Sequence, residues 1–197
     1  MLTVSQLTFE RYFQPVFKPL DFRLQAGGLL LVTGANGCGK TTLIRLLAGI
    51  LTASEGSIKS TAAGTAYVGH LLAIKDDLTV VENVRFVRDF LGTGSRAVSE
   101  VIEQLGLRRV AHQLARTLSA GQRKRCALAR LLLCRVDLWL LDEPYSNLDD
   151  EGIGMVDRLL QQHSDNGGGC VVATHGNHRP PIAGRTEIQL ISGHRSA

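Results

Sequence analysis

The chain alternates between short apolar runs of strand length and segments in which apolar residues recur every three or four positions. Leu29–Thr33 is a continuous apolar run, which predicts a buried strand, and glycine-rich sequence follows it at once. After Lys40, apolar side chains recur at helical spacing through residues 43–50, with no proline between them. Residues 29–51 therefore predict a strand, a glycine-rich turn and a helix.

The same two patterns predict the other elements. Strands are expected at residues 2–9, 65–69, 137–141, 170–174 and 187–191, and helices at residues 79–106, 119–134 and 150–164. Gly92-Thr93-Gly94 interrupts the first helical segment, and Ser119 is the expected N-cap of the second. Apolar strands that alternate with helices are typical of an α/β fold with a mostly parallel core sheet. Residues 73–134 contain no strand pattern, which favours a helical lobe inserted between core strands.

Composition sets limits on the class of protein. The 197 residues are expected to form one domain, and 44% hydrophobic residues are enough for a core. No apolar run approaches the ~18 residues of a membrane span, and the N-terminus lacks the pattern of a secretory signal. The net charge of +4 is not clustered, so we expect no nucleic-acid partner. The four cysteines form no CxxC pair and are expected to be reduced thiols.

The sequence Gly34-Ala35-Asn36-Gly37-Cys38-Gly39-Lys40-Thr41 fits the phosphate-binding pattern G-x-x-x-x-G-K-[ST]. Glycines let backbone N–H groups turn toward phosphate oxygens, and the helix that follows adds its positive end. Lys40 is expected to reach the terminal phosphates, and Thr41 to offer a hydroxyl to Mg²⁺. The predicted nucleotide-binding residues of this loop are Gly34, Ala35, Asn36, Gly37, Cys38, Gly39, Lys40, Thr41 and Thr42. The position of Cys38 also predicts a thiol that nucleotide protects from alkylation.

Two carboxylates follow the apolar run Leu138–Leu141. A strand end in an α/β sheet opens onto the ligand crevice, so we expect Asp142 to hold Mg²⁺ and Glu143 to act as the base for an attacking water. A third segment, Leu118-Ser119-Ala120-Gly121-Gln122, opens a helix and leaves backbone N–H groups free for a second anion.

The ordered set LSAGQ, LWLLDEP, SNLD and a histidine after a strand resembles the ATP-binding subunits of ABC transporters over nearly the whole chain. The resemblance implies a P-loop ATPase fold with an N-terminal antiparallel β part and an inserted helical lobe. It implies two ATP-binding subunits that meet head to tail, with Ser119 and Gly121 contacting ATP held by the partner and Asp149 lying across the seam. It also implies that His175 contacts the γ-phosphate and that Tyr12, or alternatively Phe13, stacks on adenine.

Departures from the usual family pattern narrow the resemblance. Ala120 replaces the usual glycine of LSGGQ, Gly28 stands where an acid is common, and His70 replaces the usual glutamine. The segment around Gly69-His70, together with Leu78-Thr79 and Glu82-Asn83, is similar to the ATP-binding export proteins of cytochrome c biogenesis, with Ala73 where glycine is usual.

This narrower resemblance implies an ATPase that uses ATP and Mg²⁺ on the cytoplasmic face of the bacterial inner membrane. Its partners would be permease subunits of cytochrome c maturation, and its work would be haem export or release of a haem-loaded chaperone. His70 is expected to couple the nucleotide site to the permease and to be a poorer Mg²⁺ ligand than glutamine. The cargo itself rests on the resemblance and on no residue. The alternatives are an ATPase of another ABC transporter and a soluble ABC-type ATPase in DNA repair or translation.

Overall fold

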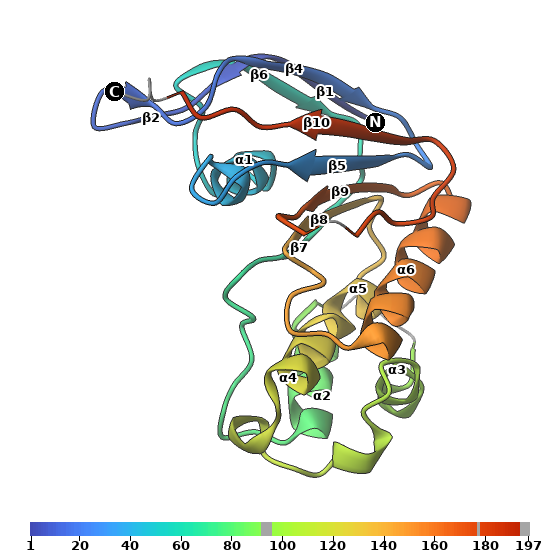
Figure 1. Cartoon of the computed structure of the whole chain (residues 1–197). Coiled ribbons are helices and arrows are strands. Elements are labelled where there is room, and N and C mark those ends of the chain that lie inside the picture. Colours follow the sequence, from blue (N-terminus) through green and yellow to red (C-terminus); the bar gives the residue numbers. More distant parts are fainter. Residues whose placement is uncertain (92–95, 177, 194–197) are drawn as a thin grey trace. The chain divides into compact units, whose positions relative to one another are not determined.

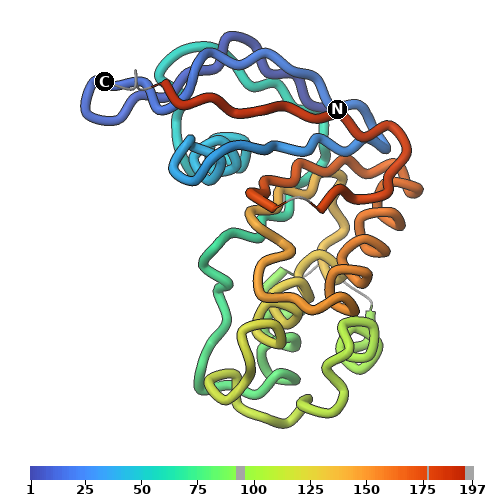
Figure 2. The backbone as a smooth tube through the Cα atoms, in the orientation of Figure 1, coloured from blue at the N-terminus to red at the C-terminus, as the bar shows by residue number. Residues whose placement is uncertain are grey.

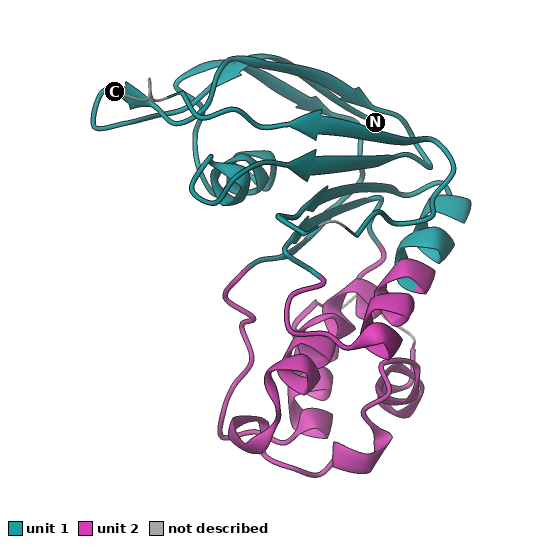
Figure 3. Cartoon of the chain, viewed as in Figure 1, with its two compact units in different colours: residues 1–69, 136–144, 159–197 teal, residues 70–135, 145–158 magenta. Residues whose placement is uncertain are grey.

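The computed structural model describes residues 1–91, 96–176 and 178–193. Within them the chain divides into two compact units (Figure 3). Unit 1 comprises residues 1–69, 136–144 and 159–197, and unit 2 comprises residues 70–135 and 145–158. The chain therefore passes from one unit to the other several times, as the backbone trace shows (Figure 2).

Unit 1 is built on a parallel sheet whose described strands run in the order β10-β5-β9-β8-β7. These strands are β5 (Leu29–Thr33), β7 (Thr65–Val68), β8 (Leu138–Asp142), β9 (Gly169–Ala173) and β10 (Arg185–Gln189), and each adjacent pair is parallel. The three central strands have nearly every residue buried, which explains their continuous apolar runs. The predicted α/β fold with a mostly parallel core is confirmed.

A second, antiparallel sheet in unit 1 has the order β4-β1-β6 (Figure 1). Its strands are β1 (Leu2–Thr8), β4 (Leu20–Leu24) and β6 (Glu55–Ser60), and a short hairpin, β2 (Glu10–Arg11) with β3 (Gln14–Pro15), adjoins it in sequence. This is the N-terminal antiparallel part that the family resemblance implied, although only the first strand had been located from the residues.

Helix α1 (Lys40–Leu47) packs against β8 and β9. Its apolar face buries Leu43, Ile44 and Leu47 in a core that also contains Leu30 and Leu140. The helix ends before Gly49, whose φ is positive, and so it is shorter than the predicted segment. The sequence pattern thus fixes α1 on the sheet with its N-terminus just after the phosphate-binding loop.

Unit 2 is helical in its described part. It contains α2 (Val80–Leu91), α3 (Val98–Gln104), α4 (Ala120–Ala127), α5 (Ala129–Leu133) and the first part of α6 (Asp150–Asp165), which continues into unit 1. Short 3₁₀ turns lie at Arg108–Val110 and Ala115–Thr117. The predicted interruption at residues 92–94 falls outside the described residues. No described helix is both long enough and apolar enough to cross a bilayer.

Further boundaries also differ from the predictions. The helix expected at 119–134 is divided at Leu128, whose ψ of −12° departs from the α-helical value, and no glycine or proline marks that break. The last strand covers Arg185–Gln189 and begins two residues earlier than the expected 187–191. Unit 2 also includes residues 145–158, which the expected lobe at 73–134 did not.

Candidate nucleotide site

The phosphate-binding loop joins β5 to α1 in unit 1. Gly39 is the N-cap of α1 with a φ of 104°, and a Cβ there would lie 2.8 Å from Val16 Cγ1. Only glycine satisfies both conditions without strain. The first turn of α1 has no acidic side chain, so its free N–H groups and the positive end of the helix stay available to an anion.

Lys40 is 93% buried, and its ammonium group lies against the loop. Its Nζ donates to the carbonyl oxygens of Gly34 at 2.8 Å and Ala35 at 3.1 Å. A buried ammonium needs such partners, and here the loop supplies them. The lysine therefore holds the loop in shape while its charge faces the cavity that it lines.

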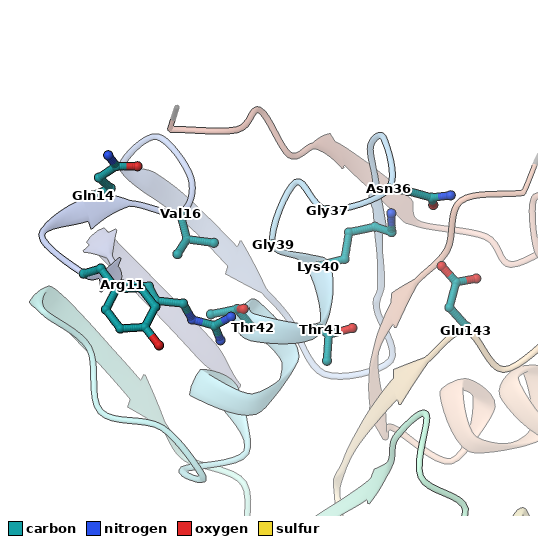
Figure 4. Close-up of a pocket in the computed structure, with 11 residues that line it drawn as sticks. Arg11, Gln14, Val16, Asn36, Gly37, Gly39, Lys40, Thr41, Thr42 and Glu143 are labelled. Carbon is teal, nitrogen blue, oxygen red and sulfur yellow. The ribbon is translucent and has the colours of Figure 1, made fainter. Parts of the chain in front are cut away.

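A cavity of about 540 Å³ opens beside this loop (Figure 4). The residues that line it are Arg11, Tyr12, Gln14, Val16, Asn36, Gly37, Gly39, Lys40, Thr41, Thr42 and Glu143. The structure thus brings together most of the predicted loop residues, Tyr12 and Glu143. Of the two aromatic candidates, Tyr12 lines the cavity and Phe13 does not.

Thr41 and Asp142 form a pair at the base of the site. Thr41 Oγ1 donates to Asp142 Oδ2 at 2.8 Å. Asp142 is 99% buried, and its Oδ1 has no hydrogen-bond partner among the described residues. A buried carboxylate oxygen without a donor costs free energy, and a cation or its water shell would relieve that cost. The donor set, a hydroxyl and a carboxylate, is the kind that Mg²⁺ accepts.

The described residues contain no cluster of three or more His, Cys, Asp or Glu side chains that could hold a metal ion by themselves. Mg²⁺ in this position would need further oxygens from water and phosphate, which is its usual habit at phosphate sites. The residues therefore fit a magnesium ion that arrives with nucleotide.

Glu143 and His175 form a second pair of side chains. His175 Nδ1 lies 2.8 Å from Glu143 Oε2. Glu143 follows β8 with a φ of 52°, and its backbone N–H donates to Ala173 O at the end of β9. A left-handed conformation is unusual for glutamate and costs free energy. Here the adjacent strand ends enforce this conformation. The two side chains come from neighbouring strand ends, as expected for a site at the carboxyl edge of a parallel sheet.

Cys38 requires a correction. Its side chain is 96% buried and lines a different cavity, of about 350 Å³, with residues 189–192. The thiol packs in the core of unit 1 and does not face the cavity that Lys40 lines. The structure therefore does not support the expectation that its thiol faces the phosphates, because the side chain is buried among core residues such as Leu190.

The residues of the second anion site that the sequence predicts lie in unit 2. A cavity of about 490 Å³ is lined there by Gly106, Ser119, Ala120, Gly121, Gln122, Arg125, Asn147 and Asp149. Ser119 caps α4 in a capping box: its Oγ accepts from Gln122 N, and its own N–H donates to Gln122 Oε1. The signal S-x-x-Q was present in the sequence and could have predicted this box.

Close approach explains Gly121, where a Cβ would lie 2.7 Å from Asn147 O. Arg125, 91% buried, binds Asp149 Oδ1 at 2.6 Å. Asp149 Oδ1 also accepts from Gly152 N, and these hydrogen bonds, that from Gly152 first, lower the pKa of Asp149. Ser119, Gly121 and Asp149 thus share one cavity within this unit. His70, the first residue of unit 2, is exposed and lines neither cavity.

Comparison with known proteins decides the family. The profile of the ABC transporter family matches residues 17–146. The chain belongs to the ABC transporter family. This ABC-family chain is 45% identical over 196 residues to "Cytochrome c biogenesis ATP-binding export protein CcmA" of Xanthomonas axonopodis pv. citri (strain 306), covering 94% of this chain and 92% of that protein. It is 42% identical over 190 residues to the protein of the same name from Cupriavidus pinatubonensis, covering 89% and 83% of the two chains.

Solved structures confirm the ABC-type fold of this chain. The ATP-binding cassette MJ0796, in a dimeric post-hydrolysis state bound to ADP and Pi, has a TM-score of 0.85 at 22% identity and covers 98% of this chain and 95% of its own. A second dimeric structure of MJ0796 has a TM-score of 0.82 at 20% identity. At this identity the likeness concerns the fold alone.

Proposed function

We propose that this chain is the ATP-hydrolysing subunit of an ABC complex that serves c-type cytochrome biogenesis, powering haem export or release of a haem-loaded chaperone. The observation that carries the ATPase assignment is the contact of His175 with Glu143, which lines the same cavity as Lys40. The pathway is supported by the name of the relatives that are 42–45% identical over most of this chain. We take the 197 residues as one ATP-binding domain with a helical lobe.

The side chains divide the work of hydrolysis. Lys40 neutralises the terminal phosphates while its carbonyl bonds keep the loop in place. Glu143 Oε2 accepts a proton from the attacking water, and the Nδ1–H of His175 orients that carboxylate. The backbone N–H groups of the loop, from Gly34 to Thr42, cradle the phosphates, and Tyr12 stacks on the adenine.

Mg²⁺ is the proposed second cofactor beside ATP. Thr41 and Asp142 would hold it, in keeping with their hydrogen bond and the unpartnered Oδ1 of Asp142. Bound there, the ion would neutralise charge on the β- and γ-phosphate oxygens.

A second copy of the chain completes the site in this proposal. Ser119 and Gly121 form an anion site at the start of α4, and no phosphate loop is part of that cavity. Head-to-tail pairing of two copies would place this cavity over ATP held by the partner, with Asp149 at the seam. The dimeric ABC cassettes of the same fold support a dimer.

We further propose that unit 2 contacts integral membrane permease subunits and thereby holds the chain on the cytoplasmic face of the inner membrane. Large apolar side chains are exposed on this unit, among them Leu71, Phe86 and Phe90. Phe86 and Phe90 stack with ring centroids 5.9 Å apart, and Lys75 Nζ lies 4.8 Å above Phe86. An apolar patch with a polar rim is typical of a protein interface. His70 immediately precedes Leu71 in the chain, and in this proposal it couples the nucleotide site to the permease.

Glu143→Gln tests the ATPase proposal. The change removes the base and leaves the phosphate cradle, so turnover should fall by about 10²–10⁴-fold while the Kd for ATP stays within a few-fold. Phosphate release and calorimetric ATP binding are measured on the same preparations. Glu55→Gln, on exposed β6, is the matched control and should keep full turnover. Near-normal turnover in Glu143→Gln would remove this residue from the mechanism.

A further inference from the structure

The nucleotide cavity contains a second cation that the phosphate-loop motif does not account for. The charged side chains that line the cavity are Lys40, Glu143 and Arg11. Arg11 lies in β2, 29 positions before Lys40, and reaches the cavity from the hairpin and not from the loop. Its guanidinium points toward Thr42, at the first turn of α1 (Figure 4).

Arg11 differs from several arginines of this chain that pair with a carboxylate in the structure. These are Arg88, Arg108, Arg116, Arg123, Arg125 and Arg179. Among the described residues, none provides Arg11 with an ion pair or a side-chain hydrogen bond. A guanidinium is always charged and presents a planar fork of N–H donors. Its open donors therefore face a cavity that is already built for an anion.

The backbone fixes where Arg11 can reach. Arg11 pairs with Gln14 in the antiparallel ladder of β2 and β3. Val16 N donates to Phe9 O at 2.8 Å and ties the base of the hairpin. Arg11 is thus held on a closed hairpin, next to Tyr12, at the end of the cavity away from the Lys40 ammonium.

The position of a side chain along the cavity determines which part of the nucleotide it can contact. In the proposed site, Lys40 and the N-terminus of α1 bind the terminal phosphates, and Tyr12 stacks on the base. The phosphate nearest the ribose must lie between them, on the side where Thr42 and Arg11 lie. We propose that Arg11 binds the α-phosphate of the bound nucleotide, adding a charge-assisted contact between the base and the phosphate loop. This inference rests on the proposed ATP site.

The test compares Arg11→Met, which keeps an unbranched side chain and removes the guanidinium and its charge, with Arg11→Lys. The matched control is Arg23→Met, an exposed arginine on β4 of the same unit that does not line the cavity. Calorimetry measures the Kd for ATP, ADP and CTP, and circular dichroism verifies folding. Arg11→Met should raise the Kd for all three by roughly tenfold, because the α-phosphate is common to them. Arg11→Lys should raise it less, and Arg23→Met by less than twofold.

Each other pattern overturns the inference. An unchanged Kd in Arg11→Met excludes a contact with nucleotide. A loss for ATP but not for ADP assigns the contact to the terminal phosphate, and a loss that depends on the base assigns it to the base. Failure of the proposed function looks different: the unmodified chain would then bind no nucleotide, or Glu143→Gln would hydrolyse ATP normally.

Discussion

The Tyr12-Phe13 turn should be a strained feature whose relief stabilises the protein. It joins β2 and β3 as a two-residue hairpin loop, and both residues have positive φ, 52° and 62°. Type I′ turns need that geometry and prefer Asn-Gly, because a left-handed residue with a side chain costs about 1–2 kcal/mol. The Phe13 side chain is 96% exposed, so little burial offsets the strain.

The magnitude follows for Phe13→Gly. The buried 4% of a phenylalanine side chain corresponds to about 0.2 kcal/mol at 25 cal/mol per Å². Relief of left-handed strain contributes about 1–2 kcal/mol, and the added flexibility of glycine in the unfolded chain takes back about 0.5–1 kcal/mol. The net expectation is a gain of about 0.5–1 kcal/mol, or roughly 1–4 °C in Tm for a chain of this length.

Phe13→Ala is the matched control, since it removes the same ring and keeps the left-handed strain. Thermal unfolding followed by circular dichroism should show a higher Tm for Phe13→Gly than for Phe13→Ala, while the Kd for ATP is unchanged in both. Tyr12→Gly should gain similar stability but lose ATP affinity, because its ring lines the cavity. Equal Tm values for the glycine and alanine variants of Phe13 would refute the strain argument.

Two further predictions concern buried groups of unit 1. Burial lowers the pKa of His163, which stacks on Trp139 with ring centroids 3.9 Å apart. Folding therefore favours the neutral form of His163. The contribution of this group to the free energy of unfolding is complete above about pH 6.5 and is lost as the pH falls toward the lowered pKa, by at most about 1.4 kcal/mol per pH unit. Urea unfolding at pH 7.5 and 5.5 should show a smaller loss for His163→Phe than for the unmodified chain, and parallel losses would contradict this. Buried Cys38 should react slowly with a thiol reagent in the folded protein, at a rate set by unfolding and not by nucleotide contact. Rapid labelling that only MgATP blocks would contradict the buried position.

Elements with a strong local signal could be predicted from the sequence. The continuous apolar run at Leu29–Thr33 reflects burial on both faces, and the helical spacing after Lys40 reflects the single buried face of α1. β6 could not be found this way, because Glu55–Ser60 carries one apolar residue and most of it is exposed. β4 did carry a signal, the alternation of Leu20, Phe22 and Leu24, which a period of two would have identified.

The candidate site shows the same division between local and distant contributions. The phosphate loop is contiguous, so its residues were predictable as a motif. The position of Arg11 at the cavity and the burial of the Cys38 thiol depend on which distant segments pack around the loop. No local sequence pattern carries that information. Ala73 is an intermediate case. Its φ of 53° explains why related sequences are expected to place glycine there, and only the resemblance pointed to that position.

Lys40 illustrates how far the site is organised before nucleotide binds. An ammonium has three donors, and two of them already bond the carbonyls of Gly34 and Ala35. The third can donate to a phosphate oxygen without breaking either bond, so binding adds a contact to a loop that is already in shape. Removal of Lys40 would therefore loosen the loop as well as delete a phosphate contact. The affinity lost in Lys40→Ala should exceed what one charge-assisted hydrogen bond contributes, in contrast to Arg11→Met, where no internal bond is lost.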